Sequence, residues 1–166
     1  MSQKIFGMPK KYLTKKRFVV AFCCERSFFY NNRSFFSIVS VQFQAGGSSV
    51  PSWELFARAV LEALKDAKID FSKIQALHLG NVYSSFTEKE TNIAPLTLST
   101  IGENVHIPSI RYESACASGD VAFRQGYSSI LSGLYDLVLV GGTERLRAVP
   151  GAEVQWVLQG MCDERH

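Results

Sequence analysis

Hydrophobic positions change their spacing repeatedly from residue 36 onward, and this change predicts alternating strands and helices. Residues 36–43 are rich in β-branched and aromatic side chains with partial alternation, which favours a strand. A loop of small and polar residues over 45–49 follows. Apolar residues then recur at helical spacing and predict a helix over residues 52–68. Ser52 would be its N-cap, with Glu54 in the first turn facing the positive end of the helix dipole.

The chain continues this alternation as far as residue 140. The predicted elements are a strand over 74–82, a polar loop over 84–92, a helix over 93–101, a strand over 107–112, a helix from 116 to about 132, and a strand over 137–140. Gly102 would end the second helix. The last strand is a continuous apolar run, which is typical of a strand covered on both faces. The third helix would bury one face: Phe123, Tyr127, Ile130, Leu131 and Leu134.

Strands that alternate with helices place the chain in the α/β class. The order β-α-β-α-β-α-β predicts a mostly parallel, mixed sheet with right-handed crossovers and helices on both faces. Cys116 would then lie at the C-terminal end of the third strand, where a helix begins. Ligands of open α/β sheets bind at that end of the strands. The pattern therefore directs attention to the residues around Cys116.

Composition limits the class of protein further. A chain of 166 residues is long enough for one domain with a hydrophobic core. Its four cysteines show neither metal-ligand spacing nor a disulfide framework: Cys23, Cys24, Cys116 and Cys162. They are interpreted as reduced thiols of an intracellular protein, in the cytoplasm, with mitochondria or peroxisomes as alternatives. No apolar run is long enough to span a bilayer, so no membrane association is expected.

Positive charge is concentrated near the start of the chain. Residues 1–35 hold eight of the 18 Lys and Arg and a single acid, Glu25, so they carry +7 while the rest of the chain carries −4. This segment is interpreted as a basic, aromatic-rich and poorly ordered extension. A presequence for organelle import fits only in part, because the segment favours Lys and Phe over Arg and Ser. A basic run alone is weak support for nucleic-acid binding, and none is expected.

The run from Arg111 to Gly119, Arg-Tyr-Glu-Ser-Ala-Cys-Ala-Ser-Gly, carries the clearest chemistry. A cysteine at a helix N-terminus has its thiolate stabilised by the helix dipole and by free backbone N–H groups. Small neighbours let a carbonyl group approach closely, and the N–H of Cys116 could contribute to an oxyanion hole. The alternative for Cys116 is a small buried side chain that serves packing alone.

This run, together with Tyr127 and the segment 132–144, resembles the nucleophile loop of the thiolase superfamily. The resemblance covers about residues 36–150, the amino-terminal half of such an enzyme, in its archaeal and sterol-carrier-type form. It implies that Cys116 accepts an acyl group from a coenzyme A thioester and passes it to a second thioester. It implies acyl-coenzyme A as substrate, with no metal or redox cofactor. Ketoacyl synthases are similar around the cysteine and remain an alternative family.

The resemblance also implies partners. In the family, the strand matching residues 107–112 pairs with its twofold mate, so a homodimer through this strand is expected. The family's second half carries a catalytic histidine and a second cysteine in motifs that none of His78, His106 or His166 matches. Residues 151–166 are interpreted as a truncated, irregular or weakly helical tail. The alternatives are therefore an incomplete acyltransferase, a subunit that pairs with a chain supplying the missing half, or a non-catalytic interaction module.

Four other polar positions have candidate roles, three of them with two interpretations each and the last, Glu144, with one. Asn81, at the end of the second strand, would line the site or form a turn. Arg111 and Arg124 would attract the phosphates of coenzyme A or lie solvated on the surface. Glu144 continues the family's Gly-Gly-x-Glu segment and is assigned a structural role.

Overall fold

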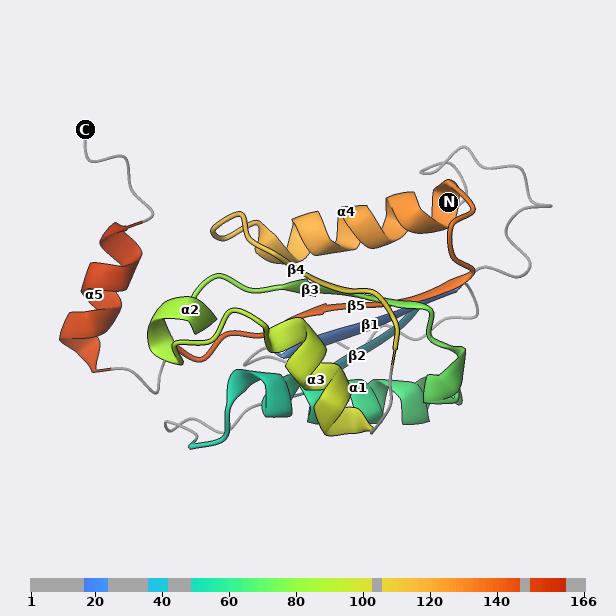
Figure 1. Cartoon of the computed structure of the whole chain (residues 1–166), viewed down its shortest axis with the longest axis horizontal. Coiled ribbons are helices and arrows are strands. Elements are labelled where there is room, and N and C mark those ends of the chain that lie inside the picture. Colours follow the sequence, from blue (N-terminus) through green and yellow to red (C-terminus); the bar gives the residue numbers. More distant parts are fainter. Residues whose placement is uncertain (1–16, 24–35, 42–48, 103–105, 147–149, 161–166) are drawn as a thin grey trace, which may run out of the picture.

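A parallel sheet with helices on both faces forms the centre of this computed structural model (Figure 1). The structure describes residues 17–23, 36–41, 49–102, 106–146 and 150–160. The strands are β1 (Arg17–Cys23), β2 (Phe36–Val41), β3 (Ala76–Gly80), β4 (Ser109–Tyr112) and β5 (Leu137–Gly142). The helices are α1 (Ser52–Ala67), α2 (Ser84–Thr87), α3 (Ile93–Ile101), α4 (Ser118–Leu131) and α5 (Gly151–Gln159), with one 3-10 turn at Phe71–Lys73. The α/β class predicted from the sequence is confirmed.

The strand order across the sheet is β2-β1-β5-β3-β4. Each described pair is parallel, so these strands form an all-parallel rather than a mixed sheet. Leu77 of β3 stands opposite Leu139 of β5 on one side and Ser109 of β4 on the other. Because the strands run the same way, the C-terminal ends of β3, β4 and β5 meet at one edge of the sheet.

Strand β1 was not predicted. It lies within residues 1–35, which the sequence analysis interpreted as an extension outside the domain, and it takes a place between β2 and β5. Its apolar run Phe18–Phe22 is an adequate strand signal, but the surrounding basic residues obscured it. Interpreting the whole segment as an extension was therefore wrong for β1. The rest of the segment lies outside the described residues.

All three predicted helices form, and one of them begins later than predicted. Helix α1 and helix α3 match their predicted spans, and Gly102 follows α3 as its C-cap. Helix α4 begins at Ser118 rather than at Cys116. The polar loop predicted over 84–92 contains the short helix α2, and the tail from residue 151 contains the regular helix α5. The shift of α4 matters most, because it leaves Cys116 in the loop before the helix.

The N-cap prediction for Ser52 was wrong. Pro51 occupies the cap, and Ser52 is the first helical residue. The N–H group of Ser52 donates to the Glu88 carboxylate at 2.8 Å, and the same oxygen accepts from Arg145 at 3.4 Å. An acid 36 residues away in the sequence thus takes over a role that local chemistry assigned to the serine.

Two hydrophobic layers cover the sheet. Helices α1 and α3 pack on one face around Phe56, Leu77 and Leu139, and α4 packs on the other. Gly126 lets α4 approach β5, since an added Cβ would stand 2.5 Å from a methyl group of Val140. Phe123, Tyr127 and Ile130 pack toward the sheet as predicted. Leu131 and Leu134 do not: 48% and 66% of their surfaces are exposed, because the helix ends at Leu131 and the chain then turns away.

Candidate active site

The C-terminal ends of β3, β4 and β5 are joined by backbone hydrogen bonds beyond the strands themselves. The N–H of Asn81 donates to the carbonyl of Tyr112 at 3.1 Å, and that of Thr143 donates to the carbonyl of Gly80 at 3.2 Å. These bonds fix the height along the sheet at which the backbone leaves each of the three strands. The loop carrying Cys116 begins at this edge, as the sequence predicted.

Residues 113–117, here called the nucleophile loop, form a tight exposed turn between β4 and α4. Cys116 is an exposed free thiol and takes no part in the hydrophobic core of the described residues. The N–H of Ala117 donates to the carbonyl of Ser114 at 2.9 Å, and that of Ser118 donates to the carbonyl of Ala115 at 3.1 Å. Ala115 has φ = 46°, a left-handed conformation that is uncommon for a residue with a Cβ.

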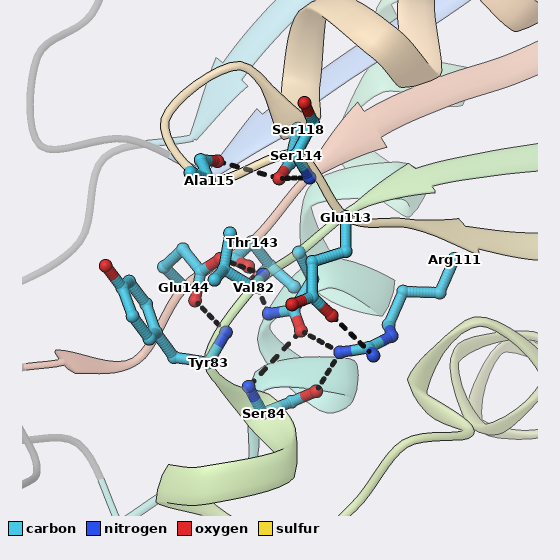
Figure 2. A network of polar contacts seen from close by, with 11 residues as sticks. Val82, Tyr83, Ser84, Arg111, Glu113, Ser114, Ala115, Ser118, Thr143 and Glu144 are labelled. Carbon is cyan, nitrogen blue, oxygen red and sulfur yellow. Dashed lines mark hydrogen bonds and ion pairs between the residues drawn. The ribbon is translucent and has the colours of Figure 1, made fainter. Parts of the chain in front are cut away.

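Ser118, the first residue of α4, closes the nucleophile loop with its side chain. Its Oγ accepts from the N–H of Ser114 at 2.8 Å and donates to the carbonyl of Ala115 at 2.7 Å (Figure 2). The main chain of Ser118 also lies against Gly80, where an added Cβ would stand 2.7 Å from the Ser118 carbonyl group. The end of β3 therefore needs glycine for this close approach.

The first turn of α4 faces the nucleophile loop. A helix leaves its first N–H groups without intrahelical acceptors, and its N-terminus carries a partial positive charge. Cys116 lies two residues before the helix, so the loop that carries it adjoins this end. The arrangement suits a thiolate or the oxyanion of a thioester addition product.

Asn81 joins three elements beneath the nucleophile loop. Only 1% of its surface is exposed. Its Nδ2 donates to the carbonyl of Thr143 at 2.8 Å, and its Oδ1 accepts from the N–H of Ser84 at 3.3 Å. The same Oδ1 accepts from Arg111 at 3.2 Å. Asn81 is therefore an internal link rather than a residue that lines an open site.

Arg111 is bonded to neighbouring side chains rather than solvated on the surface. Its guanidinium group lies over Asn81 and Ser84 and pairs with Glu113 at 2.9 Å, and 18% of the side chain is exposed (Figure 2). With its donors directed at these neighbours, Arg111 links the entrance of the nucleophile loop to α2. The alternation of β4 explains this, because Arg111 and Glu113 lie on the same face of the extended chain. Arg124 is exposed on α4.

Glu144 holds the chain that leaves β3. Its carboxylate accepts from the N–H groups of Val82 and Tyr83, the latter at 3.2 Å. Although the residue as a whole is exposed, its carboxylate lies against this backbone. Burial of the carboxylate, aided by the negative charge of Glu88, raises the pKa of Glu144 to about 7, against the opposing effect of the two N–H groups and Arg111. Burial also raises the pKa of Tyr83, with smaller contributions from the charges of Glu144 and Cys116.

The two histidines that the structure describes, His78 and His106, make no hydrogen bond to Cys116. His78 is buried in β3, where its Nδ1 lies 2.9 Å from the Tyr112 hydroxyl and its ring stacks on that tyrosine. Burial lowers the pKa of His78. His106 is exposed before β4, and His166 lies outside the described residues. No histidine within the described ranges is hydrogen-bonded to Cys116.

Comparison with known families shows which family this chain belongs to. A family model described as "Thiolase, N-terminal domain" matches residues 37–163, most of the chain. The chain belongs to the thiolase family. The match begins next to the predicted boundary at residue 36 and extends past residue 150.

Individual relatives agree with this assignment. The chain is 39% identical over 98 residues to an acetyl-CoA acetyltransferase of Methanocaldococcus jannaschii, covering 59% of this chain and 25% of the relative. It is 33% identical over 96 residues to an acetyl-CoA acetyltransferase of Methanothermobacter thermautotrophicus, covering 58% and 25%. It is also 31% identical over 109 residues to "Probable polyketide synthase 5" of Dictyostelium discoideum, covering 55% and 4%. The thiolase chain thus spans about a quarter of the length of the acetyltransferases it matches.

Sequence reasoning on this thiolase chain found Cys116 but missed the residues that hold it. Ser118 and Ala115 were included in the motif only as small neighbours, and Arg111 was assigned either to coenzyme A phosphates or to the solvated surface. The signal for Ser118 was present, because serine readily bonds to backbone groups near a helix N-terminus. No local signal marks the contact between Arg111 and Asn81, which depends on the pairing of β3 with β4.

Over the described ranges, no group of three or more His, Cys, Asp and Glu side chains could hold a metal ion. Among the helices in those ranges, none is long and apolar enough to cross a bilayer. Cys24 and Cys162 lie outside the described residues.

Proposed function

We propose that this chain is a thiolase-type acyltransferase component in which Cys116 accepts an acyl group from a coenzyme A thioester. The observation that carries the proposal is the exposed free thiol in the nucleophile loop, at the C-terminal edge of the sheet and before the N-terminus of α4. The names of the two archaeal relatives, acetyl-CoA acetyltransferases, support acetyl-coenzyme A as the substrate to test first.

Apart from proton transfers, the reaction forms one bond and breaks one bond in each half. The Cys116 thiolate attacks the thioester carbonyl carbon, a new C–S bond forms, and the bond to the coenzyme A sulfur breaks. The departing thiolate takes up a proton. The acyl-cysteine is itself a thioester and therefore keeps a reactive carbonyl group. In the second half, a base removes a proton from the α-carbon of another coenzyme A thioester. The resulting carbanion attacks the acyl-cysteine carbonyl, a C–C bond forms, and the Cys116 thiolate leaves.

The described residues provide the nucleophile and the helix N-terminus for this chemistry, but not the base. In this proposal, the partial positive charge at the N-terminus of α4 stabilises the oxygen that becomes negative when the thioester is attacked. The base that deprotonates Cys116 comes, in this proposal, from outside the described residues: another part of the same polypeptide or a partner chain. His78 is a poor candidate because it is buried and bonded to Tyr112. A thiol nucleophile also needs reducing conditions, which fits an intracellular compartment.

Intact-protein mass spectrometry after incubation with acetyl-coenzyme A tests the proposal. We expect an adduct of one acetyl group on the wild-type chain, located at Cys116 by peptide mapping. Cys116→Ala should lose the adduct, whereas the matched variant Cys162→Ala should keep it. A folded wild-type chain that stays unmodified, both alone and with a family member supplying the other half, would reject acyl transfer through Cys116.

A second candidate function is dimerisation through β4. This strand lies at the edge of the sheet, and 47% of the Ile110 surface is exposed. An exposed edge strand with unpaired N–H and C=O groups favours pairing with another chain. We propose that two copies pair through β4, either as an enzyme or as a non-catalytic interaction module. The acetylation experiment separates these two cases.

The match to a polyketide synthase favours one further substrate class. A ketoacyl synthase uses the same cysteine chemistry on acyl groups carried by a protein-bound pantetheine. Presenting acetyl-coenzyme A and acetyl-loaded carrier protein at equal concentration distinguishes the two. Faster labelling of Cys116 by the carrier protein would favour the synthase.

A further inference from the structure

The nucleophile loop contains a backbone conformation that its own sequence does not favour. Ala115, the residue before Cys116, has φ = 46°. This left-handed region suits glycine, whereas a Cβ crowds the neighbouring carbonyl group. Residues held in such conformations need surrounding interactions that outweigh the strain, and they cluster at functional sites.

The side chain of Ser118 makes the bonds that enclose Ala115. One bond reaches the N–H of Ser114, before Ala115, and the other reaches the carbonyl of Ala115 itself. Both are short, at 2.8 and 2.7 Å, and the hydroxyl acts once as acceptor and once as donor. A serine hydroxyl has one proton and two lone pairs. Its single proton is therefore committed to the carbonyl of Ala115.

Ser118 is itself held firmly. It is 5% exposed, and its main chain contacts Gly80 at the end of β3. Ala117, the N-cap of α4, has no side chain that could cap the helix or bind the loop. By contrast, Ser114, Ala115 and Cys116 are all exposed. The fixed helix end therefore restrains the exposed loop through the backbone N–H groups of Ala117 and Ser118 and, from a side chain, through the Ser118 hydroxyl.

We propose that Ser118 is a positioning residue for Cys116. Its hydroxyl holds Ala115 in the left-handed conformation, and this conformation sets the direction in which Cys116 leaves the turn toward the N-terminus of α4. The inference rests on the proposed function of Cys116 as a nucleophile. It assigns to Ser118 no contact with the substrate.

The rate at which Cys116 reacts with iodoacetamide measures this directly, without an acyl substrate. Peptide mapping isolates Cys116 from the other cysteines, and rates are taken at pH 7 and at pH 10. The thiolate is the reacting form, so the rate at pH 7 depends on how well the surroundings stabilise it. We expect Ser118→Ala to lower the ratio of the pH 7 rate to the pH 10 rate by roughly fivefold, the effect of one hydrogen bond. A change of accessibility alone would scale both rates equally.

A second substitution tests the cause. Glycine adopts the left-handed conformation without a Cβ clash, so Ala115→Gly should reduce the need for the Ser118 bonds. The double variant Ser118→Ala with Ala115→Gly should recover at least half of the lost rate ratio. Ser132→Ala is the matched control, because Ser132 donates a side-chain bond to the carbonyl of Ser129 at the far end of α4. It should leave the ratio unchanged.

Circular dichroism melts show that each variant is folded. Water can replace the Ser118 bonds, since Ser114 and Ala115 are exposed, so folding should survive. An unchanged ratio in folded Ser118→Ala, or no recovery in the double variant, would overturn the inference. These outcomes are independent of acetylation. If wild type is never acetylated but the ratio falls and recovers as expected, the proposed function fails while the positioning role of Ser118 stands.

Discussion

The Nη1 atom of Arg111 lies 3.2 Å from the Oδ1 atom of Asn81, so a cation from β4 donates to the amide that follows β3. Asn81 in turn donates to the carbonyl of Thr143 after β5. Three strand ends are therefore linked through one buried side chain. This network lies beneath the nucleophile loop and joins its entrance, through Glu113, to the sheet.

Removing Asn81 should destabilise the fold. Asn81→Ala leaves the N–H of Ser84, the carbonyl of Thr143 and one donor of Arg111 without their partner. Unsatisfied buried groups of this kind cost about 1–3 kcal/mol each, so we expect a loss of about 2 kcal/mol or more in urea unfolding. Asn92→Ala is the control. Asn92 is exposed and makes no side-chain cap bond, so its change should stay within about 0.5 kcal/mol.

Gly80 should tolerate no larger residue. A Cβ there would meet the Ser118 carbonyl carbon and oxygen at 2.7 Å, and these backbone atoms cannot rotate away. We expect Gly80→Ala to destabilise the protein by about 1–3 kcal/mol in urea unfolding and to slow the alkylation of Cys116 at pH 7. Gly151→Ala serves as the comparison, because nothing lies within 4 Å of the added Cβ. Equal stability of the two variants would contradict the close approach of α4 to β3.

Glu144 should make stability fall as the pH rises. Its pKa is raised from 4.5 to about 7 in the folded chain, so the folded state binds the proton more tightly than the unfolded state. Its favourable contribution is complete below about pH 4.5 and is lost as the pH rises through 7. Arg111 and Glu88 are the charged groups that act on it. Urea unfolding from pH 4.5 to 8 should show a smaller decline in Glu144→Gln, which keeps an acceptor for Val82 and Tyr83.

His78 should make the stability of the fold decrease as the pH falls. Burial lowers its pKa, so the unfolded state binds a proton that the folded state resists. Its contribution is complete above about pH 6.5 and is lost as the pH falls below that value. His78→Phe should flatten this acid-side decline in thermal melts taken at several pH values. The exposed His106 provides the control, and His106→Ala should leave the profile as in wild type.

Dimerisation through β4 predicts sensitivity to charge at Ile110. Ile110→Lys places a charge on the exposed edge strand, which opposes pairing with a second copy. Light scattering after size exclusion should show a dimer for wild type and a monomer for the variant. Leu61→Lys, on α1, provides a matched control because Leu61 has a similar exposed fraction, 48% against 47%. A monomeric wild type at high concentration would reject the β4 dimer.

Much of the secondary structure followed from local patterns. The spans of α1, α3 and β5 were predicted within a few residues, because periodicity and breakers such as Gly102 are local signals. Strand β1 was missed because composition outweighed an apolar run of five residues. Helix α4 started two residues late, because the bonds of Ser118 close a turn that continuous helical periodicity does not reveal.

The sequence by itself determined the α/β class, the thiolase family and the position of Cys116 between a strand and a helix. These depend on short-range order and on a motif whose residues are adjacent in the chain. Only the tertiary structure decided what holds that cysteine in place. Ser118 meets Gly80, Arg111 meets Asn81, and Glu88 meets Ser52 across long sequence separations, because parallel strands bring their C-terminal ends together. Which side chains meet at that edge depends on strand order and register, and no local pattern encodes these.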